Sequence, residues 1–345
     1  MDTSIFLLLG QDGLTGGAIY ALLALALVLV FSVTRVIYIP QGEFVAFGAL
    51  SLAAIQAGKV PSTIWLLVAM GAAVATIDTF DRWRERDMEG LGRSLAWNIA
   101  YPTGLAIVLY WANLGELNMA FQILLTLAIL VPLGPMIYRI AFQPISETSV
   151  LVLLIASVAV HLILTGFGLV FFGAEGARTA PFSNGSLMLG EISINLQTIW
   201  VVGCSLAFIV ALYLFFARTI YGKALRATAV NQSGAKLMGI SPVVAGKLTF
   251  LLAALLGVFS GVLIGPITTI YYDTGFLIGL KGFVAAIIGG LSSFPLAAAG
   301  ALLVGQLESF SSFWASAFKE VLVFTLIIPV LLWRSLTSHH VEEEE

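Results

Sequence analysis

The chain has 345 residues, of which 59% are hydrophobic and only 10% are charged. A soluble globular protein carries roughly 25% charged residues, and the mean hydropathy of +1.02 does not fit a surface that water solvates. This composition excludes a soluble domain, and the mild net charge of −3 does not suggest a nucleic-acid partner. The sequence therefore predicts a chain whose solvent is mostly lipid.

The apolar stretches are long and continuous, unlike the short alternating strands of a barrel. Because every backbone N–H and C=O must be paired inside lipid, these stretches indicate helices. We expect an all-α polytopic membrane protein, a bundle of about nine to eleven transmembrane or re-entrant helices. Eleven apolar segments support this, at residues 13–34, 41–57, 62–79, 96–112, 120–138, 149–172, 198–217, 248–270, 276–291, 295–312 and 318–333.

Two of these segments, the second and the ninth, are shorter than the ~20 residues that span a bilayer. Each is a candidate for a tilted, broken or re-entrant piece. The second follows a break at Pro40. Irregular backbone at membrane depth is tolerated where protein or water covers it, so Gln41, Gly42 and Glu43 are candidates for a translocation path. For Glu43 we favour a helix-capping role, because a carboxylate suits a helix N-terminus.

Small residues recur every four positions on several segments. Such stripes let helix backbones approach closely, either as static packing or as contacts that permit rocking. The stripes are Gly257, Gly261 and Gly265, then Ala297, Ala301 and Gly305, and near the N-terminus Gly13, Gly17 and Ala21.

Ionisable groups within apolar segments are functional candidates by default. His161 lies near the middle of the sixth segment, and Glu308 lies toward the predicted outer end of the tenth. Both are candidates for the translocation path. The simpler alternatives are a neutral histidine bonded to a neighbouring helix and a solvated carboxylate.

The distribution of basic residues predicts the orientation. If all eleven segments cross and the N-terminus lies outside, 12 of the 16 Lys and Arg residues fall on the inner side. The positive-inside rule favours this orientation, with the C-terminus in the cytoplasm and residues 339–345 as a solvated acidic tail without a metal site. The four residues assigned to the outer side are Lys59, Arg178, Lys281 and Lys319.

The predicted cytoplasmic loop at residues 218–247 is compatible with a helix and mixes small residues with basic ones. Gly239 and Ile240, followed by Pro242, indicate a helix end with a turn after it. A short helix of this kind can insert into a groove on another protein. A plain surface loop between two spans is the alternative.

Three stretches carry a resemblance to a known family. The loop has the pattern Gly, Arg-Ala and Ala-x-x-x-Gly-Ile, although the acidic start of the usual Glu-Ala-Ala motif is missing near Val230. The N-terminal stretch is GGAIYALLALALVLVFSVTRVIYIPQGEFVAFGA, and the C-terminal one is GLKGFVAAIIGGLSSFPLAAAGALLVGQLE. With these stretches the chain resembles the branched-chain amino acid ABC transporter permease family over about residues 10–75 and 130–335.

The resemblance implies the permease subunit of an ATP-binding-cassette importer that moves branched-chain or related amino acids across the bacterial inner membrane. It implies as partners a second permease subunit, identical or different, two cytoplasmic ATP-binding subunits and a periplasmic substrate-binding protein. The residues it assigns to coupling with the ATPase are Gly222, Arg226, Ala227, Ala235, Gly239 and Ile240.

The phosphate-binding motif G-x-x-x-x-G-K-[ST] is absent. We therefore expect no enzyme site and no cofactor on this chain, with ATP and Mg²⁺ on the partner subunits. Residues 1–338 are predicted to form one permease domain, in which residues 77–125 look like an insertion. An ion-coupled secondary transporter of a small polar solute, using His161 with Glu308, is the alternative. An intramembrane enzyme would need a polar catalytic cluster that the segments do not show.

Overall fold

A computed structural model describes residues 3–86, 90–189 and 192–337, so the predicted acidic tail lies outside the described residues. All eleven predicted segments are helical. The helices are α1 (Thr3–Thr34), α2 (Gln41–Gln56), α3 (Thr63–Glu85), α4 (Leu91–Leu95), α5 (Tyr101–Trp111), α6 (Met119–Leu130), α7 (Leu133–Ile137), α8 (Val150–Phe172), α9 (Leu196–Arg218), α10 (Ile220–Val230), α11 (Gln232–Leu237), α12 (Pro242–Ile264), α13 (Thr274–Ile288), α14 (Phe294–Trp314), α15 (Lys319–Thr325) and α16 (Ile327–Thr337).

Shorter turns join some of these helices. Two π-helical turns, η1 (Ala96–Ala100) and η3 (Tyr138–Phe142), continue α4 into α5 and extend α7. Within the described residues, eight helices are long and apolar enough to cross a membrane. The expected all-α polytopic membrane protein is thereby confirmed, while α2 and α13, with 16 and 15 residues, are the two short segments that the sequence singled out.

The break between α1 and α2 combines a residue in the left-handed conformation with a proline. Arg35 takes a left-handed conformation with φ of 60°, and Pro40 stands at the N-cap of α2. The freed backbone finds partners inside the protein, since the amide of Ile39 donates to Ser157 Oγ at 2.9 Å. Tyr38 packs among phenylalanine rings, with Phe250 at 4.7 Å. The break is therefore covered by protein, as irregular backbone in lipid requires.

The short helices α2 and α13 cross at the centre of the fold, backbone against backbone. A Cβ atom on Gly42 would overlap the carbonyl oxygen of Gly275, and a Cβ atom on Gly275 would overlap that of Gly42. Gly279 also faces Gly42: the Cα atom of Gly279 lies 3.2 Å from where a Cβ atom on Gly42 would stand. Since 13 of the 16 residues of α2 are buried, this crossing lies within the bundle.

The small-residue stripes mark the other close contacts. The stripe on α12 packs against α2, where Gly257 faces Phe44 and Gly261 faces the backbone of Val45. Gly17 of α1 lies against the backbone of α14, where Gly305 returns the contact. In these three pairs the lack of a side chain sets how near the helices approach.

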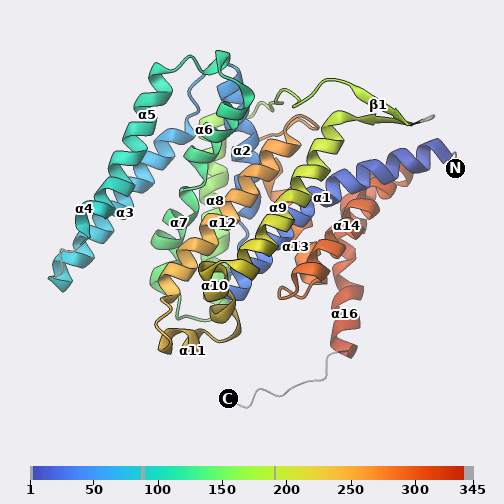
Figure 1. The fold of residues 1–345 in the computed structure, drawn as a ribbon. Coiled ribbons are helices and arrows are strands. Elements are labelled where there is room, and N and C mark those ends of the chain that lie inside the picture. Colours follow the sequence, from blue (N-terminus) through green and yellow to red (C-terminus); the bar gives the residue numbers. More distant parts are fainter. Residues whose placement is uncertain (1–2, 87–89, 190–191, 338–345) are drawn as a thin grey trace.

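Helices α3 to α5 form a hairpin beside this bundle (Figure 1). The two arms of the hairpin pack closely where Gly71 of α3 meets the carbonyl oxygen of Asn98 in η1. It covers much of the stretch that the sequence indicated as an insertion, and the insertion itself stays a prediction.

Two antiparallel strands, β1 (Ser186–Leu189) and β2 (Ile192–Asn195), were not predicted from the sequence. They pair Ser186 with Asn195 and Leu187 with Ile194. This β-hairpin and the N-terminus lie at one end of the molecule, opposite to α10 and α11 (Figure 1). The two ends are thus distinct, and which of them faces the cytoplasm stays a prediction.

A glycine-to-alanine pair tests the contact between α12 and α2. We expect Gly261→Ala to lower the free energy of unfolding by about 1–3 kcal/mol, the usual range for overpacking, because the new Cβ would overlap Val45. Gly203→Ala in α9 is the matched control: no atom lies within 4 Å of its Cβ position, so helix propensity alone predicts equal or higher stability. Thermal unfolding in detergent measures both, and equal melting temperatures would contradict the close contact.

Candidate functional site

The predicted coupling loop folds into two short helices, α10 and α11, each with its own cap. Thr219 Oγ1 accepts from the amide of Gly222 at 2.9 Å, and Asn231 Oδ1 accepts from the amide of Gly234 at 2.8 Å. Gly239 ends α11 with φ of 83°, as the sequence predicted. The amide of Ile240 then reaches back to Ala235 O at 3.0 Å, which gives this helix end the bonding of a Schellman turn.

The six predicted coupling residues divide into two groups. Gly222, Ala235 and Gly239 shape the loop: the first two are buried, and a Cβ atom on Gly222 would overlap the carbonyl oxygen of Phe215 in α9. Arg226 and Ala227 are exposed on α10 and Ile240 is half-buried. Arg226 donates to Phe216 O at 2.6 Å, so its guanidinium also fastens the loop to α9.

A groove of about 600 Å³ runs between α10 and α11, and Arg226, Ala227, Ala235 and Ile240 contribute to its walls. Beside it large apolar side chains face outward, among them Leu237, which is 88% exposed, and Met238, which is 83% exposed. Exposed apolar patches of this kind mark protein interaction sites. The sequence predicted the helices and their end, but which of these side chains face outward depends on how α10 and α11 fold against each other.

A second candidate site lies at the break before α2. Gln41 donates its Nε2 to Ala253 O at 2.9 Å, which ties α2 to α12. Glu43, in the first turn of α2, is buried and lies 2.6 Å from His161 Nδ1. His161 in turn stacks on the ring of Phe276 in α13, with centroids 4.5 Å apart. The structure thus joins Glu43, expected mainly as a cap, with His161, a pairing that sequence separation hides.

Several buried polar atoms at this site have no partner in the described part of the chain. They are Gln41 Oε1, Glu43 Oε2 and the hydroxyl of Tyr38. A buried acceptor without a partner costs free energy, so a cluster of them is a place where a polar molecule gains hydrogen bonds. Tyr38 was not among the predicted path residues.

Glu308 does not meet His161, on which the secondary-transporter alternative depended. Its Oε1 lies 2.5 Å from Lys281 Nζ, and its Oε2 accepts from the hydroxyl of Tyr20 at 2.5 Å. Glu320 is a second carboxylate on Lys281, at 3.2 Å. His161 and Glu308 therefore belong to two different clusters.

The structure buries Lys281, and its assignment to the outer side stays a prediction. The residue lies within α13 and is 5% exposed, so its charge is held by carboxylates instead of water. Its place between Leu280 and Gly282, inside an apolar run, was the available signal of a buried charge.

Removing the buried ammonium tests this cluster. We expect Lys281→Met to lower the free energy of unfolding by about 3–5 kcal/mol, the usual cost of leaving one side of a buried ion pair unpaired. Adding Glu308→Gln should restore part of the loss, since only one carboxylate then remains. Lys59→Met, at an exposed lysine, is the control. If thermal unfolding showed the same melting temperature for Lys281→Met and Lys59→Met, the cluster would not contribute.

Residues 91–331 match the family described as branched-chain amino acid transport system, permease component. The high-affinity branched-chain amino acid transport system permease proteins LivH of Salmonella typhimurium and of Escherichia coli are each 26% identical over 334 residues, covering 93% of this chain and 91% of the relative. BraD of Pseudomonas aeruginosa is 26% identical over 336 residues, covering 94% and 92%. No solved structure gave a significant match.

These matches confirm the resemblance that the three sequence stretches carried. Together with the eight candidate spans, they also confirm a multi-pass protein of the bacterial inner membrane. The matched region extends over most of the chain, from the turn of the α3–α5 hairpin to α16. The chain therefore belongs to the family of permease components of branched-chain amino acid transport systems.

Proposed function

We propose that this chain is the membrane-spanning subunit of an ATP-binding-cassette importer that moves branched-chain or related amino acids. The relatives are by name permease proteins of high-affinity branched-chain amino acid transport systems. The chain shows no phosphate-binding motif, so ATP and Mg²⁺ would be held by two cytoplasmic partner subunits. A second permease subunit and a periplasmic substrate-binding protein would complete the assembly.

The observation that carries the proposal is the loop of α10 and α11. Its capped helices present Leu237 and Met238 to solvent beside a groove, although neither side chain supports the fold of this chain. A water-soluble partner that covers them would gain the hydrophobic free energy of burial. Arg226 gives the same surface a positive edge. This combination suits a cytoplasmic ATP-binding subunit that pushes on the loop.

The membrane path would run beside the crossing of α2 and α13. The unpartnered oxygens of Gln41 and Glu43 are hydrogen-bond acceptors for the ammonium group of an amino acid. The pair of Glu43 with His161 holds the carboxylate in place from α8. The outward faces of α8 and α9 are largely apolar and exposed in this chain, which leaves room for lipid and for a second permease subunit.

The docking role of the loop is tested by a change that does not touch its fold. Met238→Asp places a charge on the exposed apolar surface, and we expect it to reduce co-purification of the ATP-binding subunits by at least about tenfold, since a desolvated carboxylate at an interface costs more than 1.4 kcal/mol. Met188→Asp is the matched control, because Met188 is 76% exposed on β1 at the opposite end of the molecule.

The readouts are the ratio of subunits recovered from a tagged permease and the ATPase rate of the complex. Unchanged recovery with Met238→Asp would overturn the docking surface. Equal loss with both variants would show a general effect of the added charge and would overturn it as well.

The cargo is tested separately through the substrate-binding protein encoded beside this chain. We expect calorimetry to detect binding of leucine, isoleucine or valine and no binding of glucose. If the protein bound sugars and no amino acid, the amino-acid assignment would fail, while the permease function would stand on its family.

A further inference from the structure

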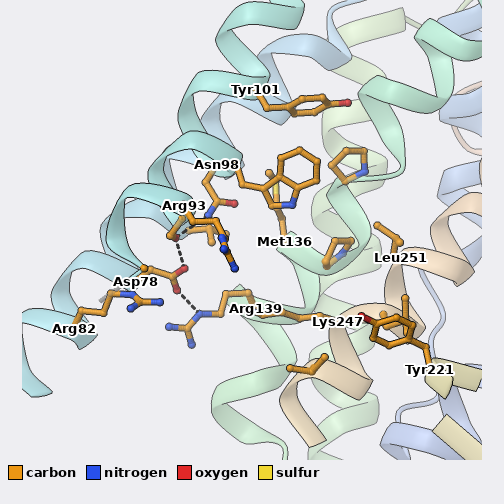
Figure 2. A pocket seen from close by; sticks show the side chains of 18 of the residues that line it. Asp78, Arg82, Arg93, Asn98, Tyr101, Met136, Arg139, Tyr221, Lys247 and Leu251 are labelled. Atoms are coloured by element: carbon orange, nitrogen blue, oxygen red, sulfur yellow. Dashed lines mark hydrogen bonds and ion pairs between the residues drawn. The ribbon is translucent and has the colours of Figure 1, made fainter. Parts of the chain in front are cut away.

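A cavity of about 610 Å³ lies between the α3–α5 hairpin and the rest of the bundle. Figure 2 shows Arg93 and Asn98 approaching it from the hairpin, with Met136, Lys247 and Leu251 on the opposite wall. None of these residues belongs to the coupling groove or to the Glu43 cluster. The proposed function leaves the cavity without a role.

The carboxylates at the cavity are already engaged. Asp78 Oδ1 accepts from Arg139 Nε at 2.8 Å, and Asp81 Oδ2 accepts from Arg139 Nη2 at 2.5 Å. The second oxygen of Asp78 accepts from Ser94 Oγ at 2.7 Å. These bonds fix the hairpin to η3 and assign both acidic groups to one arginine.

Besides Arg139 and Arg82, two cations line the cavity. The structure gives neither Arg93 of α4 nor Lys247 of α12 a hydrogen bond or an ion pair with any residue it describes. Lys247 is half-buried, so water replaces its missing partner only in part. The local charge is therefore positive and selects an anion, for which a phosphate is the best-known partner of Arg and Lys.

The remaining wall of the cavity is apolar. It is formed by Trp97 and Tyr101 of the hairpin and by Met136, Leu248 and Leu251 across from them. Trp97 and Trp83 of α3 are both 70% exposed. Exposed tryptophans on membrane helices mark the level of the lipid headgroups. A soluble anion gains no binding free energy from an apolar wall, whereas an acyl chain buries its apolar surface against it.

We propose that this cavity binds an anionic phospholipid from the membrane. Its phosphate lies at the cationic side, at Arg93 and Lys247, and an acyl chain follows the wall of Trp97 and Met136. Basic pockets between membrane helices on the cytoplasmic side bind anionic lipid headgroups in this way. Tyr221 of α10 also lines the cavity, so the bound lipid touches the coupling loop.

Native mass spectrometry of the full-length chain in detergent tests this site directly. The probes are dioleoyl-phosphatidylglycerol and, as its zwitterionic counterpart, dioleoyl-phosphatidylcholine. We expect the anionic lipid to be retained preferentially. Each cation near a membrane surface contributes about 1 kcal/mol, which is about fivefold in affinity, so Arg93→Ala with Lys247→Ala should weaken phosphatidylglycerol binding on the order of 25-fold.

The matched control is Arg84→Ala with Lys236→Ala, which removes one arginine and one lysine that are exposed and outside the cavity. Size-exclusion profiles and melting temperatures establish that both double variants fold, and Lys247→Gln replaces Lys247→Ala if the alanine variant does not. Retention of phosphatidylglycerol equal to that of phosphatidylcholine, or equal losses in both double variants, would overturn the site.

Two soluble anions complete the experiment. Inorganic phosphate and glycerol 3-phosphate, added at millimolar concentration, should not displace the lipid. If either displaced it fully, the cavity would be a site for a soluble phosphate and the lipid assignment would be overturned. None of these outcomes depends on the ATP-binding partners or on the transported solute, so failure here leaves the proposed function untouched.

Discussion

The contact between Gly42 and Gly275 is the constraint on which the rest of the structure depends. Two helices too short to cross a membrane meet there with no side chain between their backbones. Inside lipid there is little hydrophobic force between helices, so such close van der Waals contact is what holds them together. The crossing fixes the first turn of α2, and with it Glu43, next to α8 and α13.

Helix α12 connects this crossing to the coupling loop. Its N-terminus follows directly on the Schellman turn at Gly239, and its glycine stripe packs against α2. A push on α10 and α11 would therefore travel along one continuous helix to the break at Pro40. In the proposed importer, this helix would act as the lever between ATP hydrolysis and the path. The cavity at Lys247 lies on the same helix, so a lipid bound there would touch the lever near its N-terminal end.

Much of this arrangement was predictable from the sequence, because helices in lipid must be long, apolar and self-paired. Hydropathy located the eight candidate spans and the short helices α2 and α13, and the spacing of Gly257 and Gly261 marked the face of α12 that packs on α2. Gly239 predicted the end of α11, because the chain leaves this helix through a residue in the left-handed conformation, which glycine adopts readily. These are local properties, and local sequence determines them.

The clusters of polar residues were not predictable in the same way. Glu43 and His161 are 118 positions apart, and Lys281 reaches Glu308 and Glu320 on later helices. Which of them meet is decided by the crossing of α2 and α13, and no periodicity in one segment encodes it. For this reason the sequence did not show that Glu308 pairs with Lys281 and His161 with Glu43.

ATP-dependent uptake in proteoliposomes tests the central claim most directly. The chain is reconstituted with its partner subunits and substrate-binding protein, ATP is enclosed, and uptake of labelled leucine is followed after a proton uncoupler has collapsed the gradient. An ATP-driven importer predicts that uptake continues and stops when ATP is omitted. Uptake that the uncoupler abolishes while ATP remains would contradict it and would indicate an ion-coupled transporter.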